Sequence, residues 1–322
     1  MSKQKKNMGL RGLNRFLRAN CQKNIRQISL WEIRGKTIVV DASIYMYRFQ
    51  GDGGLIEGMY QMVGLLRHNN ITPIFVFDGK PPPEKREILE KRKQDKIVAE
   101  RKFKEIKRQI ADTKNDEDEV AELEAEADQL RRQFVRITGQ DILEVKKLLS
   151  IMGVSYYESD GESDGVCAKM VQKRQAFACL SEDMDMFVYG CPRVLRYLSL
   201  LKSSVVLYDL RGIITTLSLR FEDFQSICVL AGTDYNLLSE DSLDLNRALK
   251  LYAKYSKTRD GGAGFVEWVA DNGHIKDLNT FMNVIRMFDS AAVHVDKTLF
   301  TSSAFDREGL RNVLSEYGFV FP

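Results

Sequence analysis

The stretch that decides the fold is Thr37-Ile38-Val39-Val40-Asp41, a β-branched run that ends directly at an aspartate. Ile74-Phe75-Val76-Phe77-Asp78 repeats this form, and Ala176-Phe177-Ala178-Cys179-Leu180 leads into Ser181-Glu182-Asp183. A fourth apolar run covers Ser204-Val205-Val206-Leu207-Tyr208. Short, near-continuous apolar runs separated by helical patterns are typical of buried parallel strands. We therefore predict an α/β fold with a mostly parallel central sheet flanked by helices.

Helical patterns fill the intervals between these strands. The predicted flanking helices cover residues 55–69 and 141–151, and Gly153 follows the second one as a C-terminal cap. Residues 84–136 differ, because they are highly charged and contain neither proline nor glycine. Their apolar residues recur at spacings of three and four, which is a heptad seam formed by Val120, Leu123, Ala127, Leu130 and Phe134. We expect two helices here that pack on each other.

Two interpretations of this helical segment remain open. It is either a structural coiled-coil hairpin or an arch over an active site. Its position favours the arch, because the segment begins six residues after Asp78, at the end of a predicted strand. After Asp234 the chain shows amphipathic helical patterns with little strand signal.

The composition excludes several classes of protein. The 322 residues include 48 basic and 45 acidic side chains, a net charge of +3, and no apolar run reaches the roughly 18 residues of a membrane span. The basic N-terminus lacks the apolar stretch of a secretory signal. Five cysteines without a Cys-x-x-Cys pair favour reduced thiols in an intracellular compartment. Three separated histidines argue against a zinc site and against a histidine-based triad.

Basic residues are concentrated in two segments. Residues 1–36 carry ten Lys and Arg against one Glu, and residues 84–108 carry eleven against six acids. Such segments can bind phosphate backbones, although a solvated helix surface accounts equally well for either one. The acidic segment at 112–128 is expected to face solvent or a partner rather than a metal.

Carboxylates gather where the predicted strands end. Asp41, Asp78 and the pair Asp183 and Asp185 follow three of the four runs, and ligands of open α/β sheets bind at the carboxyl ends of strands. One such aspartate is as often a helix cap, but several in one cleft repel each other unless a cation lies between them. Oxygen ligands without His or Cys select Mg²⁺ or Mn²⁺. Together with Glu162-Ser163-Asp164, they predict a two-metal phosphodiester hydrolase.

Seven motifs in a fixed order add to this interpretation. Phe77-Asp78-Gly79-Lys80-Pro81-Pro82 and Glu182-Asp183-Met184-Asp185 are specific alone. The others are Met8-Gly9-Leu10-Arg11-Gly12-Leu13, Val40-Asp41-Ala42-Ser43, Leu149-Ser150-Ile151-Met152-Gly153-Val154, Glu162-Ser163-Asp164 and Leu230-Ala231-Gly232-Thr233-Asp234-Tyr235. From Met8 to about Ala248 the chain resembles the flap endonuclease and XPG family of structure-specific 5′ nucleases.

The resemblance implies roles for individual residues. Lys85 and Arg92, seven residues apart on one helix face, match the basic pair that contacts the scissile phosphate. Tyr47 matches the aromatic residue on which the base next to the cut stacks, and Gly9 lies near the DNA. Asp164 stands where the cellular flap enzymes have Glu. Two Mg²⁺ ions, which Mn²⁺ can replace, would be held by seven acids: Asp41, Asp78, Glu162, Asp164, Asp183, Asp185 and Asp234.

Plainer interpretations of the basic and aromatic residues stay open. Lys85 and Arg92 also fit the surface of a solvated helix. Tyr47 also fits a core position, although Tyr45, two residues before it, cannot share its helix face.

The implied activity is that of a Mg²⁺-dependent flap endonuclease with 5′→3′ exonuclease activity in DNA replication, repair or recombination. Its expected partner is DNA with a 5′ flap, a nick or a single-stranded 5′ end. Alternatives are a 5′-exonuclease acting on RNA or nicked DNA, and a catalytically dead nucleic-acid-binding scaffold. A monomer is expected in the nucleus, the cytoplasm or a viral replication site, neither secreted nor bound to a membrane.

Four regions follow from the resemblance. Residues 8–110 form a nuclease region with the start of the arch, and residues 111–138 form the rest of the arch. Residues 139–236 form an internal nuclease region. Residues 237–322 form a helical DNA-binding region with a degenerate helix-hairpin.

Four departures from the family pattern narrow these expectations. Seven residues precede Met8, where family members begin. The stretch Ser242–Ala248 lacks both glycines of the family's Gly-x-Gly hairpin and carries Asp244, so duplex anchoring should be weaker and independent of K⁺. Residues 50–60 form a region about ten residues shorter than in cellular flap enzymes, which leaves the preferred junction open. No clamp-binding box occurs near the C-terminus, so we expect no sliding-clamp partner. These losses fit a divergent member of the family, such as one from a large DNA virus.

Overall fold

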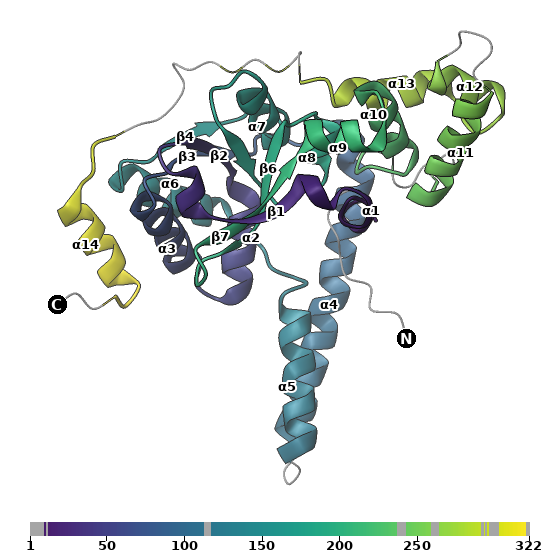
Figure 1. Cartoon of the computed structure of the whole chain (residues 1–322). Helices are drawn as coiled ribbons and strands as arrows, with labels where there is room; N and C mark the ends of the chain where they lie inside the picture. Colours follow the sequence, from purple (N-terminus) through teal and green to yellow (C-terminus); the bar gives the residue numbers. More distant parts are fainter. Residues whose placement is uncertain are drawn as a thin grey trace. The chain divides into compact units, whose positions relative to one another are not determined.

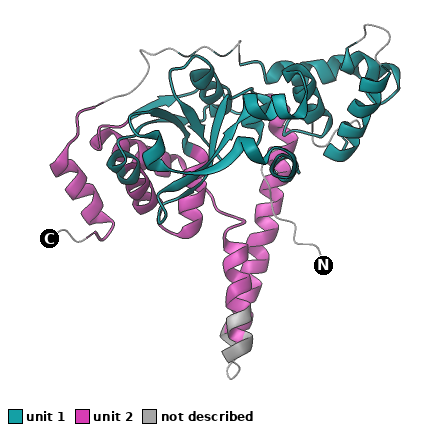
Figure 2. Ribbon diagram, viewed as in Figure 1, with its two compact units in different colours: residues 1–42, 64–82, 155–301 teal, residues 43–63, 83–154, 302–322 magenta. Residues whose placement is uncertain are grey.

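The computed structural model describes residues 10, 12–112, 117–236, 243–258, 264–290, 293, 295 and 303–319. These residues belong to two compact units (Figure 2). Unit 1 comprises residues 1–42, 64–82 and 155–301, and unit 2 comprises residues 43–63, 83–154 and 302–322. No helix among the described residues is long and apolar enough to cross a membrane.

Unit 1 is built on a seven-stranded sheet in the order β1-β7-β6-β5-β2-β3-β4 (Figure 1). The five strands from β6 to β4 in this order run parallel to one another, whereas β7 is antiparallel to β6 and β1 is antiparallel to β7. The α/β class and the mostly parallel sheet are thus confirmed. The strands are β1 (Ile25–Ser29), β2 (Thr37–Asp41), β3 (Thr72–Phe77), β4 (Ser155–Glu158), β5 (Ala178–Leu180), β6 (Arg193–Ser199) and β7 (Ser204–Asp209).

Three of the four strand predictions are right, and the fourth needs correction. The run at 204–208 is strand β7, but it is antiparallel rather than parallel, because only residues 200–203 separate it from β6 and so short a connection makes a hairpin. Strands β1, β4 and β6 were not predicted from the sequence. β1 and β4 lie at the sheet edges and carry polar residues, and β6 contains two arginines.

Helices pack on this sheet and on one another within unit 1. Helix α7 contacts β2, β3 and β5, and α10 contacts α8, α11, α12 and α13. They share one core with the first helix, in which Leu13 and Leu17 are fully buried. The helices are α1 (Leu13–Asn20), α7 (Ser163–Gln172), α8 (Asp185–Val188), α9 (Leu210–Leu217), α10 (Phe221–Leu230), α11 (Leu245–Lys257), α12 (Phe265–Asp271) and α13 (Leu278–Met287).

All five cysteines lie in the interior of unit 1. Each is a free thiol and is buried: Cys21, Cys167, Cys179, Cys191 and Cys228. Burial raises the pKa of the Cys167 thiol to about 11, so this side chain is protonated at neutral pH.

Unit 2 contains a long helical pair. Helix α4 (Arg86–Asp112) packs along α5 (Glu117–Arg131), as Figure 1 shows. Their shared core is formed by Ala99, Ile106, Ala127 and Leu130, with Leu123 and Phe134 packed against it. Arg136, which follows α5, forms an ion pair of 2.8 Å with Glu100 of α4. The predicted pairing of two helices over 84–136 is confirmed.

The other helices of unit 2 include the predicted helix at 141–151, which is α6 (Gly139–Ile151). Thr138 caps α6 reciprocally with Asp141, and Gly153 adopts a φ of +64° after its end, as a C-terminal glycine does. Helix α14 (Arg307–Glu316) packs on α6. The chain enters unit 2 within α2 (Ala42–Asp52) and leaves it within α3 (Leu55–His68). The bounds of α3 confirm the helix predicted at 55–69.

Candidate metal centre at the carboxyl edge of the sheet

Four neighbouring parallel strands, β5, β2, β3 and β4, end at the same edge of the sheet. Asp41 is the last residue of β2, and its preceding residue pairs with Leu180, the last residue of β5. On the other side, Phe77 pairs with Glu158, so that β3 and β4 end level with each other immediately before Asp78. The register therefore delivers carboxylates from all four strand ends, or from the loops that follow them, to one edge.

Hydrogen bonds connect the acids that follow β2 and β5. The Ser181 hydroxyl donates to Asp41 Oδ2 at 3.0 Å and accepts from the Asp183 backbone N–H at 3.1 Å. Asp183 Oδ1 in turn accepts from the N–H of Asp185 at 2.9 Å. Ser181 is fully buried, so this chain of bonds fixes the three aspartates relative to one another.

The end of β3 is tied to the loop after β4. Asp78 Oδ1 accepts a hydrogen bond of 2.8 Å from the N–H of Ser163, the first residue of α7. The Gly79 N–H donates to the Gly161 carbonyl at 2.7 Å. A Cβ atom at position 79 would collide with the Ser159 carbonyl, so this close approach requires glycine.

Glu162 and Asp164 are held at the start of α7. Glu162 is the N-cap residue and Asp164 lies in the first helical turn, where the helix dipole favours negative charge. Glu162 Oε2 accepts a 2.6 Å hydrogen bond from the Tyr235 hydroxyl, which lies 2.9 Å from the Tyr189 hydroxyl. Tyr235 follows Asp234 directly, so this contact brings the loop after α10 to the same group of acids.

Burial distinguishes four of these seven acids from ordinary surface carboxylates, whereas Asp78 is exposed. Four of them are at most 9% exposed: Asp41, Asp164, Asp185 and Asp234. Burial raises the pKa of the Tyr189 hydroxyl well above its usual value, and the charges of Asp164, Glu162 and Asp185 raise it further. Three of the carboxylates therefore act on this one hydroxyl, which indicates that the electrostatic potential of the site is negative.

The donor set fits a divalent cation by its chemistry. It consists of carboxylate oxygens without histidine or cysteine, the ligands that Mg²⁺ and Mn²⁺ prefer. As the side chains are placed, the described residues contain no group of three or more Asp, Glu, His or Cys arranged to hold a metal ion. The backbone thus brings the acids to one edge, although their side chains as placed do not form a joint coordination site.

The predicted nucleic-acid contacts outside this edge belong mainly to unit 2. Lys85 ends a short 3₁₀ turn (Pro83–Lys85) before α4 and is buried, whereas Arg92 lies within α4 and is partly exposed. The sequence spacing predicts that the two residues share one helix face. In the structure they belong to two successive elements, the 3₁₀ turn and α4. The core interpretation of Tyr47 is wrong, because its side chain is 41% exposed while Tyr45 is fully buried. Gly9 lies outside the described residues.

Sequence reasoning missed the side chains that hold the acids. Ser181 follows β5 and Tyr235 follows Asp234, so both have a local signal in their adjacency to predicted ligands. Tyr189 and Arg196 have none, because their contacts with Tyr235 and Glu182 depend on the three-dimensional structure.

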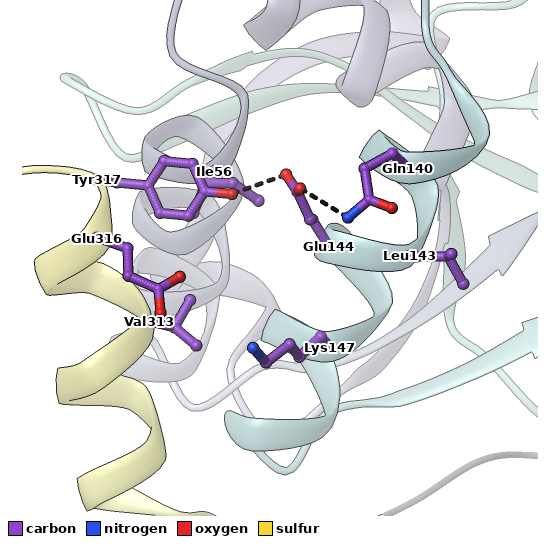
Figure 3. A pocket seen from close by; sticks show the side chains of 8 residues that line it. All are labelled: Ile56, Gln140, Leu143, Glu144, Lys147, Val313, Glu316 and Tyr317. Carbon is purple, nitrogen blue, oxygen red and sulfur yellow. Dashed lines mark hydrogen bonds between the residues drawn. The ribbon is translucent and has the colours of Figure 1, made fainter.

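A separate hollow lies within unit 2 between α3, α6 and α14 (Figure 3). Its volume is about 230 Å³, and it holds none of the predicted site residues. Glu144 accepts hydrogen bonds there from the Tyr317 hydroxyl, at 2.7 Å, and from the Gln140 amide, at 3.0 Å. Its lining residues are Ile56, Gln140, Leu143, Glu144, Lys147, Val313, Glu316 and Tyr317.

Solved structures share this fold. The catalytic core of Rad2 in complex with a DNA substrate superimposes with a TM-score of 0.66 at 23% identity, covering 97% of this chain and 95% of that one. The Holliday junction-resolving enzyme GEN1, in complex with product DNA and a Mg²⁺ ion, gives 0.58 at 19% identity, covering 90% and 70%. Flap endonuclease-1 from Methanococcus jannaschii gives 0.64 at 25% identity, covering 91% and 90%.

Sequence comparisons agree with the structural ones. The XPG N-terminal domain matches residues 8–99 and the XPG I-region matches residues 153–234. Flap endonuclease 1 of Bos taurus is 30% identical over 71% of this chain and 62% of its own length. Flap endonuclease 1-A of Sorghum bicolor is 32% identical over 95% of this chain and 82% of its own length. The chain therefore belongs to the flap endonuclease and XPG family of structure-specific 5′ nucleases, as a divergent member.

Proposed function

We propose that this chain is a Mg²⁺-dependent flap endonuclease with 5′→3′ exonuclease activity that hydrolyses DNA phosphodiesters in replication, repair or recombination. One observation carries the proposal: four neighbouring parallel strands end at one edge, where buried carboxylates gather. Membership of the family supports a nuclease, and the structures of Rad2 with a DNA substrate and of GEN1 with product DNA support DNA as the substrate of relatives.

The acids would act as the ligands of two Mg²⁺ ions, or of Mn²⁺ in their place. Asp41, Asp78, Glu162 and Asp164 would hold one side, and Asp183, Asp185 and Asp234 the other. When bound, the metals would supply an activated water and stabilise the leaving oxygen.

The remaining site residues would handle the DNA. Lys85 and Arg92 would neutralise the charge of the scissile phosphate as it develops in the transition state. Tyr47 would stack on the base next to the cut, a contact worth about 1–3 kcal/mol. Gly9 would lie near the DNA, and the pair of helices α4 and α5 would admit a single-stranded 5′ end but not a duplex.

Cleavage assays on labelled DNA test this proposal. The wild-type chain should cut a 5′ flap in Mg²⁺ and not in EDTA, and Asp183→Ala should lower the rate by about 10³-fold or more. Asp209→Asn is the matched control, because Asp209 ends β7, whose antiparallel direction places it away from the edge of the proposed ligands. Unchanged cleavage by Asp183→Ala would refute the catalytic assignment.

The choice of substrates decides between related activities. Flap, nicked and Y-shaped DNA, tested beside an RNA with a free 5′ end, separate a flap endonuclease from an RNA-directed 5′-exonuclease. Binding of these substrates without any cleavage would instead identify a nucleic-acid-binding scaffold.

A further inference from the structure

The loop that carries Asp183 and Asp185 is held by one buried side chain of the neighbouring strand. Arg196 of β6 is only 6% exposed. Its Nη2 donates to the Glu182 carbonyl at 2.8 Å, and its Nη1 donates to Met184 Sδ at 2.8 Å. A single guanidinium therefore contacts the residue before and the residue after Asp183.

The Glu182 side chain completes this arrangement. Its Oε2 lies 3.6 Å from Arg196 Nε, and its Oε1 accepts a 2.6 Å hydrogen bond from the N–H of Tyr197. The backbone and the side chain of Glu182 are thus both bound to β6. Because Glu182 follows Ser181, which bonds Asp41, the loop is fixed at two successive residues.

The β6 backbone departs from regular geometry to make these contacts. The pairing of β6 with β7 is irregular between Arg196 and Ser199, and Tyr197 adopts a φ of +56°. A bulky residue rarely adopts this left-handed conformation. The Tyr197 ring lies 4.8 Å from the Arg196 guanidinium and 5.1 Å from that of Arg18, and its hydroxyl accepts from Asn14 at 2.7 Å. These contacts maintain the bulge, and strain of this kind clusters at functional sites.

The chemistry of the pair points to positioning rather than to stability alone. A buried ion pair often stabilises a fold no better than apolar residues of the same size. Arginine, however, presents planar donors in a fixed geometry that lysine lacks, which suits it for holding several groups of one loop. Partners of this kind orient metal ligands in many proteins.

We infer that Arg196 and Glu182 are positioning residues that hold Asp183 and Asp185 in place for divalent cations. The inference rests on the proposed function. The contacts of Arg196 and Glu182 keep the loop that bears the two carboxylates at the sheet edge against their mutual repulsion, so that less of this loop has to be ordered when a cation binds.

Binding of Mn²⁺ alone to the full chain tests this inference, measured by calorimetry on Arg196→Gln, Arg196→Lys and Glu182→Gln. Each variant should bind Mn²⁺ about 10–100-fold more weakly than the wild type. Their affinity for flap DNA in EDTA should not change, and cleavage should recover in part as Mn²⁺ is raised. Arg220→Gln is the control and should bind Mn²⁺ like the wild type. It breaks an Arg–Asp ion pair with Asp223 at the start of α10, and Asp223 is not a proposed metal ligand.

The outcomes separate the inference from the proposed function. Wild-type Mn²⁺ affinity in Arg196→Gln and Glu182→Gln would overturn the inference alone. An equal loss of Mn²⁺ binding, of DNA binding in EDTA and of thermal stability would also overturn it, since that pattern marks a purely structural role. A wild-type chain that binds no Mn²⁺ and cuts no DNA would refute the proposed function itself. If Arg196→Gln does not fold, Glu182→Gln keeps the side-chain volume and decides the question.

Discussion

The Tyr235 hydroxyl donates a hydrogen bond of 2.6 Å to Glu162 Oε2, which joins the loop after α10 to the start of α7. Burial raises the pKa of Tyr235 well above its usual value, so the hydroxyl stays protonated and remains a donor at neutral pH. The bond fixes the carboxylate of one proposed metal ligand from a side chain that does not itself coordinate.

Tyr235→Phe should therefore raise the Mg²⁺ concentration for half-maximal cleavage by about tenfold, because outer partners of metal ligands commonly contribute that much. A metal titration of the cleavage rate measures the change. Tyr189→Phe is the matched variant and should have a smaller effect, because the Tyr189 hydroxyl bonds Tyr235 rather than the carboxylate. Equal half-saturation in the wild type and Tyr235→Phe would contradict this role.

Tyr47 allows the stacking of a DNA base on its ring to be tested with little effect on the stability of the fold. Its side chain is exposed, with Lys96 Nζ 4.9 Å from the ring centroid. Tyr47→Ala should lower the cleavage rate about tenfold or more while changing the free energy of unfolding by less than about 0.5 kcal/mol. Tyr47→Phe should retain the wild-type rate, because it keeps the ring.

The neighbouring Tyr45 provides the contrast for this prediction. It is fully buried, so Tyr45→Ala should destabilise the fold by about 3–5 kcal/mol. Chemical denaturation of both variants measures the difference. A large loss of stability in Tyr47→Ala would show that its ring packs instead of binding DNA.

The family resemblance predicts that Asp244 occupies a helix-hairpin position where relatives have glycine. Its side chain is the N-cap of α11 and accepts from the N–H of Arg247 at 3.1 Å. Asp244→Gly should cost only a few tenths of a kcal/mol in stability and should strengthen duplex binding, because a negative charge near phosphate is removed. Binding of the wild type should be equal in KCl and NaCl.

Fluorescence anisotropy with a labelled duplex measures both effects. Asp306→Gly is the control, since Asp306 caps α14 in the same way in unit 2. Clearly tighter binding of the wild type in KCl than in NaCl would show that the hairpin retains the K⁺ site of the family.

The Tyr317–Glu144 hydrogen bond in the hollow of unit 2 should depend on pH. Partial desolvation of a side chain that is still 44% exposed, followed by the bond to the Glu144 carboxylate, raises the pKa of Tyr317 to about 12, above the value of about 10 in an unfolded chain. A raised pKa means that the stabilisation is fully present below about pH 10 and is lost as the pH rises through about 12.

Tyr317→Phe should accordingly be less stable than the wild type by no more than about 0.5 kcal/mol at pH 8, because the bond is exposed to solvent, and this difference should vanish near pH 12. Urea unfolding followed by circular dichroism measures it. In Glu144→Gln the loss should still begin near pH 10 but should be smaller and end at a lower pH, because without the nearby charge the pKa of Tyr317 in the folded chain is raised less. A difference that stays constant between pH 8 and 12 would exclude ionisation of Tyr317 as its cause.

The sequence predicts the strands that end at the candidate metal centre better than it predicts the rest of the sheet. β2, β3 and β5 are short apolar runs because both faces are covered, so their pattern is visible without the structure. β6 is an inner strand whose sequence contains Arg193 and Arg196. Its arginines are accommodated by partners distant in sequence, such as Glu182, and no local rule contains that information.

The same limit applies to the candidate site. Each acid follows a recognisable strand or belongs to a recognisable motif, so the acids could be named from the sequence. The contacts that orient them join residues separated by up to 140 positions, as Ser181 and Asp41 are. Local periodicity predicts elements and their ends, but it does not predict which side chains meet across the fold.

The burial of all five cysteines has a practical consequence for attaching fluorophores. A maleimide dye should leave the native thiols unmodified, because they are shielded and protonated in the folded chain. A cysteine introduced at Leu201, which is 93% exposed in the turn between β6 and β7, would then be the single reactive position. Single-molecule experiments on this nuclease therefore need no cysteine-free background.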